Sequence, residues 1–70
     1  MVQLSAVIIK EEETYIAKCP ETGTVSQGST LEEAIENLKE ATSLYLEEFP
    51  LKINIRPLLT TFEVQNVAVA

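Results

Sequence analysis

The feature that most constrains this chain is a helix signal in its middle. Thr30-Leu31-Glu32-Glu33 fits a capping box, in which the threonine hydroxyl accepts the N–H of residue 33 and the glutamate reaches back to the cap N–H. Apolar residues then recur at helical spacing up to Pro50, which cannot continue a helix. The pattern predicts a helix over residues 31–48, about five turns long. Its apolar face would hold Leu31, Ala34, Ile35, Leu38, Ala41, Thr42, Tyr45, Leu46 and Phe49.

Three strands are expected before this helix. Residues 2–10 and 14–19 alternate apolar with polar side chains and are rich in β-branched types, and residues 24–27 form a third, shorter run. The glutamates at 11–13 are interpreted as a solvated turn, and only weakly as a cation or basic-patch site. Because that run lacks the Gly or Asn of a tight primed turn, we expect a slightly longer or irregular hairpin. Residues 20–23, Pro-Glu-Thr-Gly, are the clearest turn in the sequence.

The chain after the helix predicts one more strand. Residues 51–61 are bracketed by Pro50 and Pro57, which favours an extended edge or linker, and residues 62–69 resume strand alternation. The expected fold is a single α+β domain over residues 1–70 with the order β-β-β-α-β. An antiparallel meander and a right-handed crossover would give a four-stranded mixed sheet of order 3-2-1-4, with the helix on one face. The other face and the sheet edges would be left for a partner.

The composition excludes several kinds of chemistry. The chain has 70 residues and a net charge of −6, it contains no histidine, and every acidic residue is glutamate. Ser-His, Cys-His and His-metal sites are therefore impossible, and we expect no metal or other cofactor. An acidic surface is poorly suited to phosphate backbones, whereas it complements a basic protein.

The single cysteine and the apolar segments indicate in which cellular compartment the chain works and whether it contacts a membrane or another copy of itself. Cys19 cannot form an internal disulfide, and its phase with Tyr15 and Ala17 favours packing over reactivity. The N-terminus has no basic region before an apolar run, and no stretch approaches the ~18 apolar residues of a membrane span. A cytoplasmic protein with no membrane contact is expected. The apolar end, residues 67–70, predicts a homodimer or higher homo-oligomer, because an uncovered apolar strand invites pairing.

Two groups of residues are candidates for binding a partner. The first is the turn with Pro20, Glu21 and Gly23, and the second is the helix stripe with Glu36 and Glu40. A charged stripe is most often just a solvated face. However, Glu36 and Glu40 repel each other at i,i+4, an arrangement that local stability alone would not select.

Several segments together resemble a known family. These are Tyr15-Ile16-Ala17-Lys18-Cys19-Pro20-Glu21, then Gly23, then Val25-Ser26-Gln27-Gly28-Ser29-Thr30, then Glu32-Glu33-Ala34 and Asn37-Leu38-Lys39-Glu40-Ala41. In this order they closely resemble the HicB-like antitoxins, over about residues 4–48 and again at residues 59–64.

The resemblance implies both a fold and a role. HicB-like proteins have the β-β-β-α-β domain, and they neutralise HicA, a small basic toxin that cleaves mRNA with a histidine, by covering its active surface. Many of them carry a C-terminal DNA-binding domain. No second helical pattern follows residue 48 here, so we expect no direct DNA binding. The apolar connection at residues 51–59 also differs from the polar linker often found in the family.

Two other functions remain open at this point. The chain could be a stand-alone homo-oligomeric binding module of the same family, with no cognate toxin. It could also be a degenerate nuclease that uses glutamates and Mg²⁺, since the family fold is similar to a truncated ribonuclease H sheet. Such nucleases need clustered carboxylates, and only Glu63 lies well inside a predicted strand, so we expect no catalysis.

Overall fold

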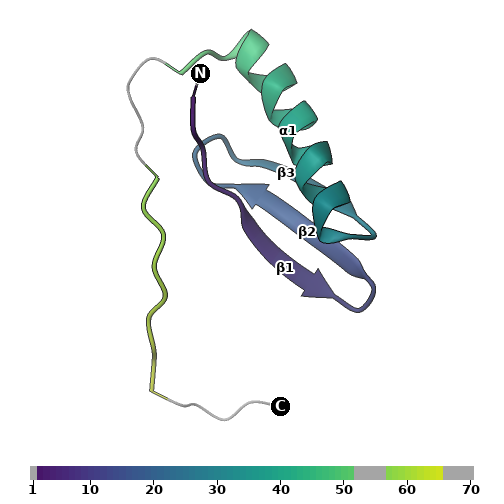
Figure 1. Ribbon diagram of the computed structural model, residues 1–70. Helices are drawn as coiled ribbons and strands as arrows, with labels where there is room; N and C mark the ends of the chain where they lie inside the picture. The colour runs from purple at the N-terminus through teal and green to yellow at the C-terminus, as the bar shows by residue number, and fades with distance from the viewer. Residues whose placement is uncertain (1, 52–56, 66–70) are drawn as a thin grey trace.

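The structure is a three-stranded antiparallel sheet with one helix packed on it. The computed structural model describes residues 2–51 and 57–65. Its elements are β1 (Val7–Glu11), β2 (Thr14–Cys19), β3 (Thr24–Gly28) and α1 (Leu31–Glu48), and the sheet order is β1-β2-β3. Figure 1 shows α1 running along one side of the sheet. The predicted helix and meander are therefore confirmed.

The hairpin between β1 and β2 is tighter than predicted. Glu11 pairs with Thr14, so only Glu12 and Glu13 form the turn, and the expectation of a longer or irregular connection is wrong. Glu12 takes the positive φ that a tight turn needs, 55°. A left-handed conformation costs a non-glycine residue about 1 kcal/mol. The five paired positions of β1 and β2 set the register that imposes it.

The turn between β2 and β3 matches its prediction. Gly23 has a φ of 80°, which suits glycine, and its N–H donates to the carbonyl oxygen of Cys19 at 2.7 Å. Cys19 in turn pairs with Thr24, so the turn directly joins the two strands.

The first strand starts later than predicted, because its partner strand β2 ends at Cys19. The alternation of apolar and polar residues predicts that residues 2–6 belong to this strand, but β1 begins at Val7, which pairs with Lys18. Continuing the same register would place Ser5 opposite Pro20, which has no N–H to donate and already belongs to the turn. Residues 2–6 therefore leave the sheet.

The predicted fourth strand is not seen. Residues 57–65 form no strand, and the rest of the predicted strand, residues 66–69, lies outside the described residues, as do residues 67–70 of the expected pairing segment. The described sheet is purely antiparallel rather than mixed, and the order 3-2-1-4 holds only for its first three strands. Alternation makes a segment able to form a strand, but it does not supply the partner edge.

The core is small and lies between α1 and strands β2 and β3. It consists of Ala17, Cys19, Ala34 and Leu38, with Leu4, Ala6, Ile8 and Tyr15 packed against it. The predicted role of Cys19 in packing is confirmed, since it is buried.

The apolar face predicted for the helix is longer than the part of it that is buried against the sheet. Leu31 and Phe49, at its two ends, are 42% and 60% exposed. An 18-residue helix is about 27 Å long, whereas a five-residue strand such as β3 spans about 17 Å. The ends of the helix therefore reach past the sheet.

Two local contacts fix the start of the helix. Thr30 Oγ1 accepts the N–H of Glu33 at 3.0 Å, as the capping box predicts. The Glu33 carboxylate accepts the N–H of Ser29 at 2.7 Å, one residue before the cap rather than at the cap itself. At the end of β3, a Cβ on Gly28 would lie 2.6 Å from the backbone nitrogen of Ala34, so only glycine allows this close approach.

Candidate functional site

One face of the sheet is left uncovered by the helix. Residues that pair across antiparallel strands share a face, and the face alternates along each strand. Ala17 and Cys19 face α1, so the residues in the opposite phase form the other side. We call this side the open face: it holds Val7, Ile9, Glu11, Thr14, Ile16, Lys18, Val25 and Gln27.

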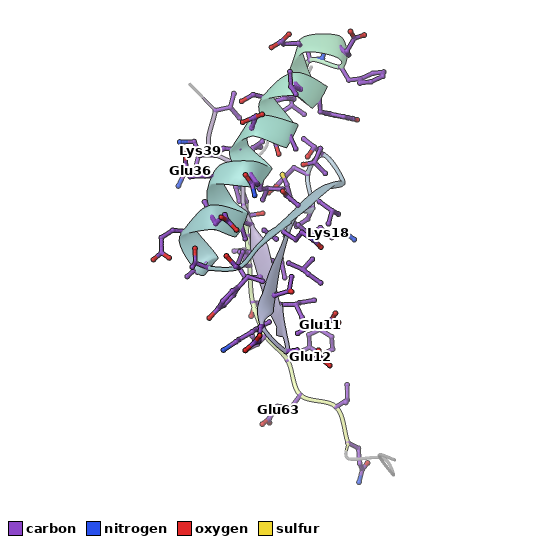
Figure 2. All side chains as sticks on the ribbon, turned by 90° about the vertical axis from the view of Figure 1, so that its right-hand side faces the viewer. Glu11, Glu12, Lys18, Glu36, Lys39 and Glu63 are labelled. Atoms are coloured by element: carbon purple, nitrogen blue, oxygen red, sulfur yellow. The ribbon has the colours of Figure 1, made fainter. Side chains whose placement is uncertain are left out.

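The middle of the open face is apolar. Ile9 pairs directly with Ile16, and Ile9 and Val25 are each 55% exposed. Lys18 lies between Val7 and Val25 across the strands, and Figure 2 shows its side chain pointing away from α1. Exposed aliphatic side chains gathered on one face are typical of an interaction surface.

The hairpin end of the open face is acidic. A hollow of about 640 Å³ lies there, lined by Glu11, Glu12, Thr14, Ile16 and Gln27. We call it the acidic hollow. Its two carboxylates, with the hydroxyl and the amide beside them, offer acceptors for a lysine or arginine side chain. The sequence interpretation of residues 11–13 favoured a solvated turn and gave a cation or basic-patch site little weight. The signal for such a site was the phase of Glu11, which follows Val7 and Ile9 along one side of β1.

The turn residues predicted to bind a partner divide into two kinds. Pro20 and Gly23 are exposed, whereas Glu21 is half-buried and engaged within the chain. Its carboxylate accepts the Ser5 hydroxyl at 2.6 Å and the Ser5 N–H at 3.2 Å. The Ser5 hydroxyl holds the pKa of Glu21 below its ordinary value, against the opposing effect of burial. Glu21 therefore ties residues 2–6 to the β2–β3 turn.

The helix stripe is a separate surface. Glu36 and Glu40 are exposed, and Glu36 lies 3.5 Å from Lys39 in a pair whose side chains are about 70% exposed. Figure 2 shows Glu36 and Lys39 on the helix, away from Glu11 and Glu12. Within residues 2–51 and 57–65, no hydrogen bond or ion pair links this stripe to the turn. The five predicted residues thus do not form one site.

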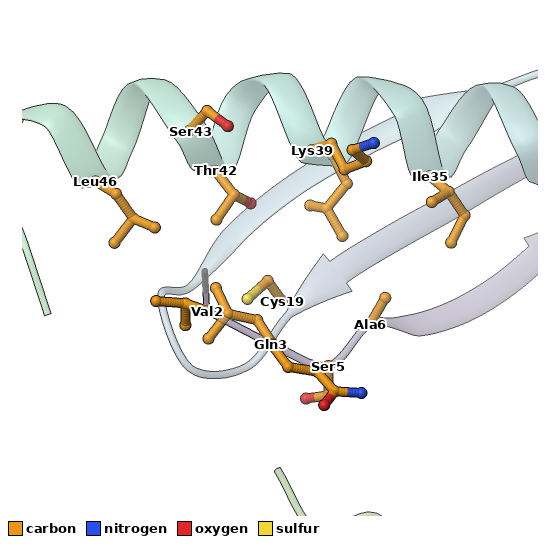
Figure 3. Close-up of a pocket in the computed structure, with 12 residues that line it drawn as sticks. Val2, Gln3, Ser5, Ala6, Cys19, Ile35, Lys39, Thr42, Ser43 and Leu46 are labelled. Carbon is orange, nitrogen blue, oxygen red and sulfur yellow. The ribbon is translucent and has the colours of Figure 1, made fainter. Parts of the chain in front are cut away.

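A second hollow lies between α1 and residues 2–6. It has a volume of about 500 Å³, and Figure 3 shows Ile35 and Leu46 pointing into it from the helix. We call it the helix groove; it is lined by Val2, Gln3, Leu4, Ser5, Ala6, Cys19, Ile35, Leu38, Lys39, Thr42, Ser43 and Leu46.

In the part of the chain that the structure describes, no group of three or more Cys, His, Asp or Glu side chains could hold a metal ion. Nor does any helix there have the length and apolar composition that a membrane span requires. Glu63, the one acid in the predicted last strand, lies exposed on the extended segment after the helix.

Among the described residues, the architecture is that of a small α+β protein whose sheet is covered by a helix on one face only. The chain is homologous to a UPF0150 protein of Helicobacter pylori (strain J99 / ATCC 700824), with 52% identity over 44 residues. The match spans 61% of this chain and 61% of that relative. No protein-family model matches the chain, and no solved structure matches it.

Proposed function

We propose that this chain is a HicB-like antitoxin, with no catalytic activity of its own, that binds and occludes a HicA-type ribonuclease in the cytoplasm. Two things support the family part of the proposal. They are the ordered motifs of residues 15–41 and the homology to a UPF0150 protein, since UPF0150 corresponds to the HicB-like family, although the name states no role.

The open face is the observation that carries the role. Its apolar centre around Ile9 and Ile16 can be desolvated by a partner, and the acidic hollow at its end can receive a basic side chain. The net charge of −6 also favours encounter with a basic protein. A ribonuclease must bind RNA through a basic surface, so an acidic cover would compete with RNA for that surface.

The β2–β3 turn and the helix stripe are expected to contribute less to partner binding than the open face. Pro20, Gly23, Glu36 and Glu40 are exposed and remain predicted partner contacts. Glu21 remains a predicted partner contact only through its position in the turn, because its carboxylate already accepts a hydrogen bond from Ser5.

Two double variants with the same change of charge can locate the surface. Glu11→Gln with Glu12→Gln alters the acidic hollow, and Glu36→Gln with Glu40→Gln alters the helix stripe. Binding to a HicA-type ribonuclease from the same genome is measured by calorimetry at low and high salt, together with RNA cleavage. We expect roughly tenfold weaker binding for the first pair, which corresponds to about 1.4 kcal/mol, and less than threefold for the second.

The wild-type complex should also weaken as salt rises, because exposed charges steer it. If the helix-stripe pair loses more affinity than the hollow pair, the surface is misplaced but the function stands. If the wild-type chain neither binds the ribonuclease nor stops RNA cleavage, the antitoxin proposal fails.

A second candidate is a stand-alone homo-oligomeric module with no toxin. The observation that favours it is the exposed apolar segment after the helix, where Leu58 is 90% exposed. A low-salt pull-down from native lysate with mass spectrometry separates the two candidates. A stoichiometric basic protein favours the antitoxin, and recovery of only the chain itself favours the module.

A further inference from the structure

The two edges of the sheet are not equivalent. At the β3 edge, Asn37 of α1 donates its side-chain N–H to the carbonyl oxygen of Gln27 at 2.9 Å, so the helix partly occupies that edge. β1 is the other outer strand and pairs only with β2 among the described residues. An edge strand with free backbone groups can accept a further strand.

The helix groove lies on the β1 side of the helix-covered face. Residues 2–6, which lead into β1, form one wall, and α1 forms the other (Figure 3). Its lining is mostly apolar, and Lys39 is its one charged residue. A strand added along residues 2–11 would therefore place its inward side chains over this groove.

The segment after the helix has the properties such a strand requires. We call residues 57–65 the arm. In an extended strand, Leu58, Phe62 and Val64 project to the same side, and they are 90%, 84% and 75% exposed. Figure 1 shows the arm running apart from the sheet of its own chain. Apolar side chains this exposed on one side favour burial against another surface.

We propose that the arm binds as a fourth strand to the β1 edge of a second copy of this chain, with Leu58, Phe62 and Val64 covering the helix groove of that copy. The exchange is reciprocal, so it closes as a symmetric dimer. It goes beyond the proposed antitoxin role and does not depend on it, because it uses neither the open face nor a toxin.

Charge and length both fit the arm of a second copy as the segment that covers the helix groove. Each copy carries a net charge of −6, so most of its surface would repel a second copy. The groove and the facing side of the arm are exceptions. The single charge of the groove is the cation Lys39, and Leu58, Phe62 and Val64 are uncharged, whereas Glu63 lies in the opposite phase and would point away from the groove. Nine extended residues span about 30 Å, close to the roughly 33 Å of a ten-residue stretch such as residues 2–11.

The test measures mass and contact separately on the full chain. Sedimentation of the wild type should give twice the 7.8 kDa chain mass, and Phe62→Glu should give the monomer. Leu44→Glu is the matched control, because Leu44 is 59% exposed on the helix and lines neither the groove nor the arm. It should remain a dimer. In a mixture of isotope-labelled and unlabelled copies, the Phe62 ring should give intermolecular contacts to the Ile35 and Leu46 methyl groups.

Three results would overturn the proposal. One is a wild type that is monomeric at the concentrations used for spectroscopy. Another is a dimer that survives Phe62→Glu with the fold intact by circular dichroism. The last is a set of Phe62 contacts that are only intramolecular, which would mean that the arm closes on its own sheet. None of these results tests toxin binding, because the toxin is proposed to bind the open face, which this dimer does not use.

Discussion

The hydroxyl oxygens of Thr24 in β3 and Thr42 in α1 lie 2.7 Å apart, which makes a direct polar link between the sheet and the helix. Thr42 is 8% exposed, and Thr24 also lies 2.8 Å from the hydroxyl of Thr22 in the preceding turn. Three threonines thus join the turn, the strand and the helix in one chain of hydrogen bonds. In so small a core, such a chain fixes where α1 sits on β3.

Removing the buried hydroxyl should destabilise the protein without changing its shape. Thr42→Val keeps the branched side chain but breaks the bond to Thr24, at an expected cost of about 1 kcal/mol in the free energy of unfolding. Urea denaturation measures it. Ser43→Ala, on the exposed neighbour, should stay within about 0.5 kcal/mol of the wild type. Equal stabilities for Thr42→Val and the wild type would show that the hydroxyl chain contributes nothing.

The Glu21 carboxylate should make stability depend on acid pH. Its pKa in the folded state is below the ordinary 4.5, mainly because of the Ser5 hydroxyl. The unfolded chain therefore binds more protons between the two pKa values, so this contribution is present above about pH 4.5 and is lost as pH falls through the folded pKa.

We expect the stability gap between the wild type and Glu21→Gln to shrink from pH 6 to pH 3, as measured by urea denaturation at each pH. Ser5→Ala should reduce the acid dependence in the same way, since it removes the main cause of the shift. Glu40→Gln, on the exposed helix stripe, should leave the acid dependence as in the wild type. If the stability difference between the wild type and Glu21→Gln stayed constant with pH, the hydrogen bonds between Ser5 and Glu21 would not lower the pKa of Glu21.

The two glycines should respond differently to substitution. Gly28→Ala places a Cβ 2.6 Å from the Ala34 nitrogen and 2.9 Å from Glu33 backbone and side-chain atoms, so α1 must shift. Overpacking of this kind costs about 1–3 kcal/mol. At Gly23 a Cβ meets nothing within 4 Å, and only the φ of 80° is unfavourable. Asparagine tolerates that φ, so thermal melts should show Gly23→Asn retaining more stability than Gly23→Ala, with no such rescue by Gly28→Asn.

Relieving the backbone of Glu12 should stabilise the hairpin. Glu12→Asn places a residue that tolerates a positive φ at 55° and should gain about 0.5–1 kcal/mol, a rise of a few degrees in Tm. Glu13→Asn is the control, because Glu13 is the other turn residue and has no positive φ. The gain at Glu12 should come with weaker ribonuclease binding, since its carboxylate lines the acidic hollow. An unchanged Tm would mean that the turn is not strained there.

Local patterns predicted the elements whose causes lie close together in the chain. The capping threonine, the apolar spacing and Pro50 bound the helix at Leu31–Glu48, and Pro20 with Gly23 marked the second turn. Strand alternation also placed Cys19 on the buried side. Each of these signals acts over a few residues, through backbone geometry or side-chain periodicity.

The misjudged features depend on how strands pair with one another rather than on the residues of one segment. The tight hairpin at Glu12 follows from the register of β1 on β2. The loss of residues 2–6 from the sheet follows because a continued register would set Ser5 opposite Pro20, which has no N–H to donate. The acidic hollow could not be read from residues 11–13 alone, because Gln27 of β3 completes it.

By itself, the sequence determined that this protein has an amphipathic helix after three short strands, a strongly acidic surface and no histidine chemistry. Only the tertiary structure decided which face α1 covers, where the carboxylates gather and which edge of the sheet has no strand partner among the described residues. The physical reason is that periodicity fixes which side of an element is apolar, whereas packing and strand pairing decide what that side meets.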